Sequence, residues 1–337
     1  MIILSNCLTD TADEGTRKVA TNMVRVLKEK KPDTTVITYD SRCSLSDVHL
    51  SVNKLLLSRN LLNLVKNKKE ELLYIPSPAK LLPLAIRMFV LSKAAKTGLS
   101  VVLTMPFAVK PLSKKLLQVS GAKILTLCER TRQYYAQALE IPVRRLCAGV
   151  DVQRFCPVSR QEKEALRKQY GLPAEKPIVL HVGHLKKGRN VAQLLNLSEK
   201  FHGVLVVSPH TAEEQDTKLK AQLLEKENIT LIEEYIPQIE QIYQLSDVYL
   251  FPVVQEESCI DSPLSALEAA ACGIPVVTTD FGEMKSLLDE AGFYQIRSFA
   301  PEQLSGLLEQ AIGEKQDPRP AVLAYDWQNA VAALLEN

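Results

Sequence analysis

Short apolar runs, rich in β-branched residues or leucine, alternate with helical patterns along the whole 337-residue chain. In the first half these runs are residues 1–5, 34–40, 72–76, 100–106 and 122–128. In the second half they are residues 177–183, 203–209, 229–235, 247–252 and 274–280. Runs this apolar, separated by helices, are typical of parallel strands that are covered on both faces. The sequence therefore predicts an α/β protein with two open, doubly wound sheets.

The chain length and one charged segment divide these runs into two domains. A chain of 337 residues is long enough for two domains of ordinary size. Residues 149–177 hold a charged helical pattern between loop-forming segments, so we expect an N-terminal domain of residues 1–155 and a C-terminal domain of residues 170–320. The last residues, from about 322 to 337, are predicted to form one amphipathic helix that packs back near the first domain. Two such domains facing each other would leave a central cleft, and open α/β sheets bind ligands beyond the carboxyl ends of their strands.

The composition argues against several protein classes. Hydrophobic residues make up 46% of the chain and charged residues 24%, as in globular proteins. The N-terminus reaches Asp10 before an apolar run of signal-peptide length develops, and no stretch approaches the roughly 20 apolar residues of a membrane span. The seven cysteines form no CxxC pair, which favours reduced thiols over disulfides or a zinc site. We therefore expect a cytoplasmic protein.

The charges are distributed unevenly. Of the 41 Lys and Arg residues, 24 lie in residues 1–150, together with only 11 of the 39 Asp and Glu residues. No acid occurs between Glu71 and Glu129. Such a surface suits an anionic partner, and we expect the first domain to associate peripherally with an anionic membrane. Residues 81–96 fit a buried helix as well as a membrane surface, whereas residues 111–119, with Lys114 and Lys115 beside leucines, are the better candidate.

Residues 262–280 carry the first candidate binding residues. Ser262 suits a helix N-cap and Pro263 the first helical position, which would leave the N–H groups of Leu264 and Ser265 free to meet an anion. Gly273 should end this short helix. Glu268 could accept two hydrogen bonds from a vicinal diol such as a ribose, although acids in first turns are often only helix-stabilising.

The loop HVGHLKKGRN, residues 181–190, follows a predicted strand and opens a helix. Its basic side chains could meet a phosphate, but a GxGxxG or Walker motif is absent, and an exposed basic turn would look the same. We assign His181 to the strand itself. The basic candidates of the loop are His184, Lys186, Lys187 and Arg189.

The order of four segments resembles the retaining glycosyltransferases of family 4, which have the GT-B fold of two Rossmann-like domains. These segments are GVDVQRFCP, HVGHLKKGRN, IPQIEQIYQLSDVYLFP and LSALEAAACGIPVV. The resemblance is strong across residues 124–280 and weaker before them. It implies a nucleotide sugar, UDP- or GDP-linked, bound mainly by the second domain as a substrate, with no further cofactor.

The resemblance also implies roles for individual residues. Glu268 matches the glutamate that holds the ribose hydroxyls, and His184 stands where the family usually has arginine. Lys187 matches the family's lysine and, with Arg189, would neutralise the leaving phosphate. Gly15 matches the first-loop glycine that lets a phosphate approach the backbone. The loop whose amides meet the diphosphate or the sugar corresponds to Pro263, Leu264 and Ser265.

The chain departs from the family pattern at two places. The position of the first motif glutamate holds Ile260, which suggests a four-residue insertion, so that Glu256, Glu257 or Asp261 would supply the carboxylate. The histidine that many members carry near the reacting sugar is absent from residues 75–80 and 104–110, where Ser77 could fill part of the gap. We therefore name no general base. We also expect no metal, because no aspartate pair with the character of metal ligands stands out.

Three functions fit these observations. The leading hypothesis is a hexosyltransferase that transfers a sugar to a lipid-linked or membrane-proximal glycan acceptor in polysaccharide or glycolipid biosynthesis. A nucleotide-sugar epimerase of the same fold would typically use several carboxylates and a histidine in the cleft. A catalytically weak or inactive homologue would bind a sugar nucleotide or a partner protein. No feature points to nucleic acid.

Overall fold

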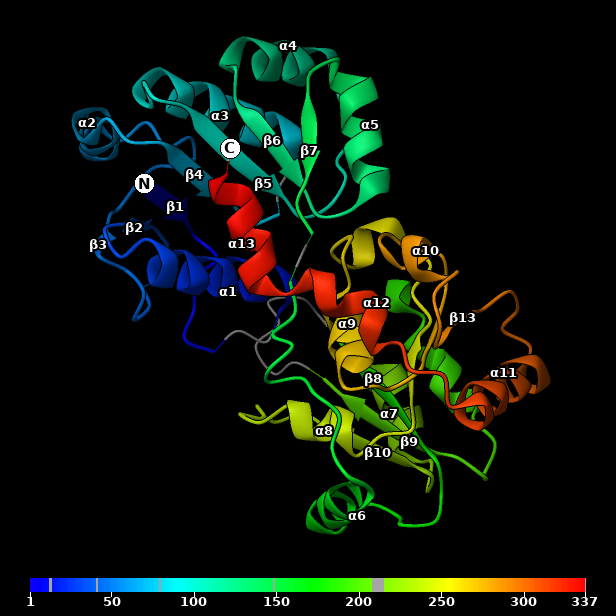
Figure 1. The fold of residues 1–337 in the computed structure, drawn as a ribbon. Helices are drawn as coiled ribbons and strands as arrows, with labels where there is room; N and C mark the ends of the chain where they lie inside the picture. The colour runs from blue at the N-terminus through cyan, green and yellow to red at the C-terminus, as the bar shows by residue number, and fades with distance from the viewer. Residues whose placement is uncertain (12–13, 41, 79, 148, 208–214, 337) are drawn as a thin grey trace. The chain divides into compact units, whose positions relative to one another are not determined.

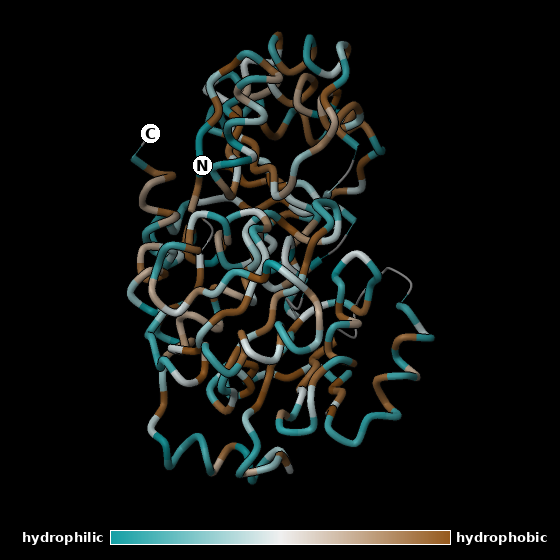
Figure 2. Tube along the Cα trace, turned by 90° about the vertical axis from the view of Figure 1, so that its right-hand side faces the viewer, coloured by the Kyte–Doolittle hydropathy of each residue, from teal (hydrophilic) through white to brown (hydrophobic). Residues whose placement is uncertain are grey.

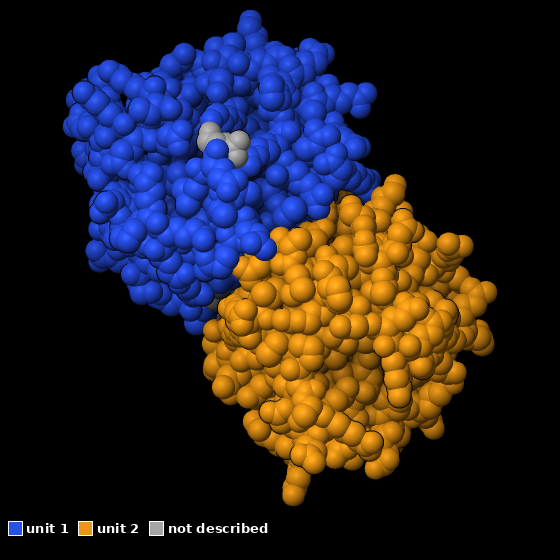
Figure 3. Space-filling view, viewed as in Figure 1, with its two compact units in different colours: residues 1–148, 260–262, 327–337 blue, residues 149–259, 263–326 orange. Residues whose placement is uncertain are grey.

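The computed structural model describes residues 1–11, 14–40, 42–78, 80–147, 149–207 and 215–336. The chain forms two compact units, coloured separately in Figure 3. Unit 1 consists of Met1–Ala148, Ile260–Ser262 and Trp327–Asn337. Unit 2 consists of Gly149–Cys259 and Pro263–Asp326. Each unit is built around a sheet of parallel strands (Figure 1).

The described residues of unit 1 form a seven-stranded parallel sheet with the order β3-β2-β1-β4-β5-β6-β7. Its strands are β1 (Ile2–Ser5), β2 (Thr35–Thr38), β3 (Val48–His49), β4 (Leu72–Ile75), β5 (Leu99–Leu103), β6 (Lys123–Thr126) and β7 (Val143–Arg145). Its helices are α1 (Gly15–Lys30), α2 (Arg59–Lys68), α3 (Leu81–Ala94), α4 (Pro111–Ser120), α5 (Glu129–Leu139) and α13 (Trp327–Leu335).

Helices cover both faces of this sheet. Ile2 and Leu4 pack into a core cluster with buried residues of α2, α3, α4 and α5. Ile3 lies between them in β1 and points to the opposite face, because side chains alternate along a strand. The helices α1 and α13, which pack against each other, contribute nothing to that cluster. The prediction of a doubly wound sheet is confirmed for this unit.

The described residues of unit 2 form a six-stranded parallel sheet with the order β10-β9-β8-β11-β12-β13. Its strands are β8 (Ile178–Val182), β9 (His202–Val206), β10 (Ile229–Ile232), β11 (Val248–Phe251), β12 (Val276–Thr278) and β13 (Phe293–Gln295). The chain leaves β8 toward β9 on one side, whereas β11 and β12 continue the sheet on the other side. The strand order therefore reverses between β8 and β11, and open α/β sheets bind ligands at such a point.

Unit 2 contains α-helices and 3₁₀-helices, the latter labelled η. Its α-helices are α6 (Arg160–Gln169), α7 (Thr217–Leu224), α8 (Glu240–Gln244), α9 (Leu264–Ala271), α10 (Met284–Leu287), α11 (Pro301–Glu314) and α12 (Arg319–Val322). Its 3₁₀-helices are η1 (Lys187–Arg189), η2 (Val191–Asn196), η3 (Glu256–Ser258) and η4 (Leu323–Tyr325).

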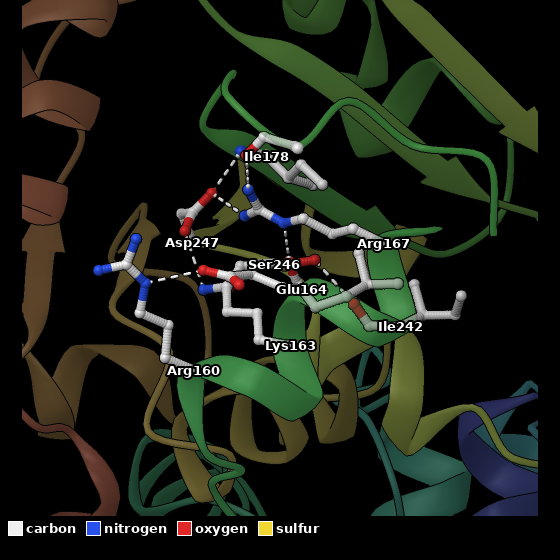
Figure 4. A network of polar contacts seen from close by, with 10 residues as sticks. Arg160, Lys163, Glu164, Arg167, Ile178, Ile242, Ser246 and Asp247 are labelled. Atoms are coloured by element: carbon white, nitrogen blue, oxygen red, sulfur yellow. Dashed lines mark hydrogen bonds and ion pairs between the residues drawn. The ribbon is translucent and has the colours of Figure 1, made fainter. Parts of the chain in front are cut away.

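A polar network fastens the charged helix α6 to the sheet of unit 2 (Figure 4). The helix starts with a capping box, in which the Ser159 hydroxyl accepts a hydrogen bond from the Glu162 N–H. Further along, Arg167 donates to the carboxylate of Asp247 and to main-chain oxygens. Lys163 contacts the same carboxylate at 2.8 Å, and Asp247 also accepts from the N–H of Ile178 at 2.6 Å. Asp247 therefore links α6 to the start of β8.

The structure differs from the sequence prediction at several chain segments. It adds the short strands β3, β7 and β13, which lie at the edges of the two sheets. The predicted strand at residues 203–209 is β9, which ends at Val206, and residues 208–209 lie outside the described part of the chain. The predicted C-terminal helix from about residue 322 is wrong in its extent. Asp326 forms a bridge with Val150, so the backbone leaves the helical conformation there and α13 begins at Trp327.

Hydrophobic segments occupy the interior of each unit, and hydrophilic segments lie at its periphery (Figure 2). All seven cysteines are free thiols, five of them buried. Among the described residues, no helix is both long enough and apolar enough to cross a bilayer.

Candidate functional site

The loop that follows β8 carries the most distinctive side chain of unit 2. Arg189 is only 9% exposed. Its Nε donates to the main-chain oxygen of Ser258 at 3.1 Å, and its guanidinium forms no ion pair with any described carboxylate. A buried cation without an anionic neighbour is costly. This position is therefore suited to an anion from outside the chain.

Gly183 makes room for that guanidinium. A Cβ atom on Gly183 would lie 2.5 Å from Nη1 of Arg189 and 3.1 Å from Nε2 of His181. Any larger residue would displace the arginine. Because position 183 has no side chain, the guanidinium of Arg189 can lie against Gly183, which directly follows β8.

The loops after β8 and β11 hold each other in place. The Ser258 hydroxyl donates to the main-chain oxygen of Gly188 at 3.1 Å. A Cβ on Gly188 would lie 2.9 Å from Cβ of Ser258 and would clash with the amide oxygen of Gln255. The close approach of η1 and η3 therefore requires glycine at position 188. Both loops lie beyond the carboxyl ends of the two strands where the strand order reverses.

The other basic residues of the loop differ in exposure. Lys187 is exposed and forms no ion pair within the described residues. His184, which stands where the resemblance places an arginine, is buried. Of the Lys and Arg residues in this loop, Lys187 is exposed, Lys186 is half-buried and Arg189 is buried.

The helix α9 starts one residue later than predicted. Pro263 has ψ 96° and is the N-cap residue, and its carbonyl oxygen accepts from the N–H groups of Ala266 and Leu267. The prediction that Pro263 is the first helical residue is wrong, because that ψ lies outside the helical range. Leu264 and Ser265 are the first two helical residues, and their N–H groups have no partner among the described residues. Gly273, with φ +74°, ends the helix as predicted.

Two tyrosines surround the inner part of this helix. Glu268 is 5% exposed and accepts a hydrogen bond from the Tyr243 hydroxyl at 2.8 Å. Burial, and then the nearby Glu268, raise the pKa of Tyr243 well above its usual value, so the hydroxyl keeps its proton and donates it to the carboxylate. Tyr249 of β11 donates to the main-chain oxygen of Val182 at 3.2 Å. Sequence reasoning missed both tyrosines, because an aromatic residue in a predicted helix or strand is normally a core residue.

The three carboxylates proposed to replace the first motif glutamate do not all lie in the same unit. Glu256 is exposed at the start of η3 in unit 2, next to Glu257, which is also exposed. Asp261 is buried in unit 1, where its carboxylate accepts from the Thr131 hydroxyl of α5. Its N–H also donates to the main-chain oxygen of Thr104 at 3.0 Å. Asp261 is thus already bound by side-chain and main-chain groups of unit 1.

Gly15, the remaining candidate, is the first residue of α1 in unit 1. A Cβ there would lie 3.0 Å from Cδ1 of Ile260, which borders the space that the glycine leaves. The Ser77 hydroxyl accepts from the Asn6 amide at 2.9 Å, at the carboxyl ends of β4 and β1. Within the described residues, no group of three or more His, Cys, Asp and Glu residues is arranged to hold a metal ion.

Comparisons with known proteins agree with this arrangement. Residues 162–322 match the family model described as glycosyl transferases group 1. A D-inositol 3-phosphate glycosyltransferase from Corynebacterium jeikeium (strain K411) is 29% identical over 161 residues. The alignment covers 44% of this chain and 38% of that protein, so this chain matches well under half the length of the relative.

Two solved structures share the fold over nearly the whole chain. A glycosyltransferase from Rickettsia africae ESF-5 has a TM-score of 0.79 at 14% identity and covers 99% of this chain and 97% of its own. Anabaena Alr3699/HepE, in complex with UDP and glucose, has a TM-score of 0.75 at 14% identity, with 99% and 98% covered. At this identity the likeness concerns the fold alone. Residues 162–322 therefore resemble the glycosyl transferases group 1, and the chain has the two-domain Rossmann-like GT-B fold.

Proposed function

We propose that this protein is a retaining glycosyltransferase of the hexosyltransferase type, which uses a nucleotide-sugar donor. The observation that carries the proposal is Arg189, a buried guanidinium without an anionic partner among the described residues, at the carboxyl edge of the unit 2 sheet. A nucleoside diphosphate supplies the missing negative charge. The Anabaena protein of the same fold is described in complex with UDP and glucose, which supports this class of donor.

The reaction requires little of the protein beyond positioning and charge. The bond from the sugar C1 to the leaving phosphate oxygen breaks, and a bond from C1 to the acceptor oxygen forms on the same face. The acceptor's proton passes to the leaving phosphate oxygen, so no separate general base is needed. Arg189, Lys187 and the N–H groups of Leu264 and Ser265, which have no partner among the described residues, stabilise the negative charge that grows on the phosphate.

The donor's ribose is assigned to Glu268, as the resemblance implies. Its carboxylate is held by Tyr243, which keeps one oxygen in a fixed direction. A carboxylate has about four acceptor sites, so a bond to Tyr243 leaves capacity for ribose hydroxyls. UDP- and GDP-linked sugars both carry this ribose diol, so both are tested as donors.

The acceptor is proposed to be a lipid-linked or membrane-proximal glycan. Residues 1–150, nearly all of which lie in unit 1, hold 24 Lys and Arg residues against 11 Asp and Glu residues, whereas the rest of the chain has more acidic than basic residues. Its helix α4 exposes Leu112 at 57% and Val119 at 56%, beside the exposed Lys115. The leucines of this segment do not all face water, since Leu117 belongs to the core, and Lys114 forms an ion pair with Glu140 at 2.7 Å. Of the candidate segment 111–119, the side chains that we propose for membrane contact are therefore Leu112, Lys115 and Val119.

A sugar-nucleotide-binding homologue without catalysis is the second candidate. It is favoured by the carboxylate of Asp261, which is bound to Thr131, and by the exposure of Glu256 in η3. Incubation with a panel of labelled UDP- and GDP-sugars separates the two, with retention of label on the protein, nucleotide release and sugar transfer as readouts. Release of nucleotide supports the transferase. Binding without release supports the binding protein, and absence of both contradicts the two.

A further inference from the structure

His181 is buried near the carboxyl end of β8, and one of its ring nitrogens has no partner in the described part of the chain. The side chain is 0% exposed. Its Nδ1 lies 2.8 Å from the main-chain oxygen of Leu250 in β11. Nε2 is buried as well and has no hydrogen-bond partner among the described residues. A buried polar atom without a hydrogen-bond partner costs about 1–3 kcal/mol of stability. The presence of such an atom beside the candidate site therefore suggests a function for it.

The contact to Leu250 fixes the chemical form of the ring. A carbonyl oxygen can only accept a hydrogen bond, so Nδ1 carries the proton and donates it. Burial, opposed by this hydrogen bond and assisted by the nearby Arg189, lowers the pKa of His181 to about 4. The ring is neutral at neutral pH. Nε2 therefore presents a bare lone pair, which can accept a hydrogen bond but cannot donate one.

Nε2 of His181 and Nη1 of Arg189 both border the space left by the missing side chain of Gly183. The point where Gly183 would carry a Cβ is 3.1 Å from Nε2 of His181 and 2.5 Å from Nη1 of Arg189. The bond from Nε to Ser258 holds only the inner edge of the guanidinium. Its Nη groups have no described partner. A second hydrogen bond, at Nη1, would hold the outer edge as well.

We propose that His181 is a positioning residue whose Nε2 accepts a hydrogen bond from Nη1 of Arg189 when the diphosphate of the donor binds. This role rests on the proposed function, since it takes Arg189 as the group that meets the diphosphate. With one edge on Ser258 and another on His181, the arginine presents its remaining N–H groups to the phosphate in a single orientation. Donors held in a fixed orientation before the chemical step stabilise the charge that develops during it. A protonated His181 could not take this part.

The first test observes the histidine directly. Long-range ¹H–¹⁵N spectra distinguish a protonated ring nitrogen from a bare one, and the chain has only five histidines, so the spectrum of His181→Phe assigns the signal. UDP and GDP are the probes, titrated separately. We expect Nε2 of His181 to be bare in the free protein and to shift toward a hydrogen-bonded value with the nucleotide that binds. The shift should be absent in Arg189→Ala.

Two results of this titration would overturn the inference, for different reasons. Binding of UDP or GDP without a change at His181 would remove the role of His181 and leave the proposed function standing. Binding of neither nucleotide, together with absence of turnover, would overturn the proposed function and the inference with it.

The second test measures turnover in a double-mutant cycle. His181→Phe keeps the ring shape and removes the lone pair, and we expect kcat to fall about tenfold with little change in KM. In the Arg189→Ala background the same substitution should cause no further loss. His181→Gln, whose amide offers a donor and an acceptor, should restore part of the rate. An equal loss in both backgrounds would mean that His181 only supports the strand.

His202 provides a matched control for this cycle. It lies on the neighbouring strand β9, and its Nε2 is already engaged with the Thr230 hydroxyl at 2.8 Å. It pairs in register with Ile178 at the amino end of β8, which is the end away from the candidate site. His202→Phe should leave kcat unchanged. A loss similar to that of His181→Phe would count against the inference.

Discussion

Arg189 donates from Nε to the main-chain oxygen of Ser258 at 3.1 Å, and this bond joins two loops through residues that are 69 positions apart in the chain. Ser258 returns a hydrogen bond to Gly188, the neighbour of Arg189. The two loops follow β8 and β11, the strands between which the strand order of unit 2 reverses. The two loops of the candidate donor site are therefore held together by contacts within unit 2. The effect of a mutation in these loops can be explained from these contacts.

Glu268→Ala should weaken the binding of the nucleoside diphosphate. The substitution removes a buried carboxylate and its charge-assisted hydrogen bonds, and we expect a loss of about 1.5–3 kcal/mol of binding free energy. Titration calorimetry with UDP and GDP measures it. Tyr243→Phe, which keeps the carboxylate, is the matched control and should cost less. Unchanged affinity in a folded Glu268→Ala protein would exclude Glu268 from the site.

Lys187→Ala and Arg189→Ala should lower kcat more than they raise KM for the donor. The negative charge on the leaving phosphate grows mainly in the transition state, so groups that stabilise it affect turnover first. Arg189→Ala should have the larger effect, because its guanidinium is buried and Lys187 is exposed. Steady-state kinetics with the active nucleotide sugar decide this. Wild-type rates in both variants would show that the loop takes no part in the reaction.

Gly188→Ala should loosen the contact between η1 and η3. The new methyl group would meet Cβ of Ser258 at 2.9 Å, and overpacking of this kind costs about 1–3 kcal/mol. Both the melting temperature and the affinity for the nucleotide should fall. Gly306→Ala is the matched control, because it lies in α11 with no atom within 4 Å of the added carbon. That variant should be as stable as the wild type or slightly more stable. A Gly188→Ala protein with unchanged stability and affinity would contradict the tight approach of the loops.

Asp247→Ala should strongly destabilise unit 2. It would leave the guanidinium of Arg167, which is 7% exposed, without its carboxylate, and breaking a buried pair costs about 3–5 kcal/mol. Urea unfolding followed by circular dichroism gives the change. Arg160→Ala, which removes a solvent-exposed pair with Glu164 on the same helix, should produce no measurable change. Comparable losses of unfolding free energy in the two variants would show that the burial of the Arg167–Asp247 pair does not explain the destabilisation.

The protein should sediment with anionic vesicles and not with neutral ones, and salt should release it. Each basic residue near anionic lipid contributes about 1 kcal/mol, so a handful gives reversible binding. Leu112→Ser combined with Val119→Ser should weaken the association, because these side chains are the exposed apolar ones on α4. Leu224→Ser, at a residue of α7 that is 62% exposed in unit 2, is the control and should bind normally. Binding that ignores lipid charge and salt, or no binding, would favour a soluble acceptor.

The sequence by itself determined the fold class and the end of α9. The alternation of apolar runs and helices follows from local chain geometry, and it predicted parallel sheets covered on both faces. Gly273 ends α9 because a left-handed residue is needed there, and that requirement acts within a few residues. The edge strands β3, β7 and β13 escaped prediction, because strands of two or three residues carry too little pattern.

Only the tertiary structure decided which side chains meet. Arg189 was a candidate from its charge, but its burial depends on the absent side chain of Gly183 and on the carbonyl of Ser258. The same holds for Glu268, whose partner Tyr243 comes from another helix. Asp261 follows β11 in the chain, yet it bonds to Thr131 of unit 1. Local pattern fixes the period and the ends of an element, whereas a buried polar partner depends on which distant segments pack together, and that information is not present in any single stretch of sequence.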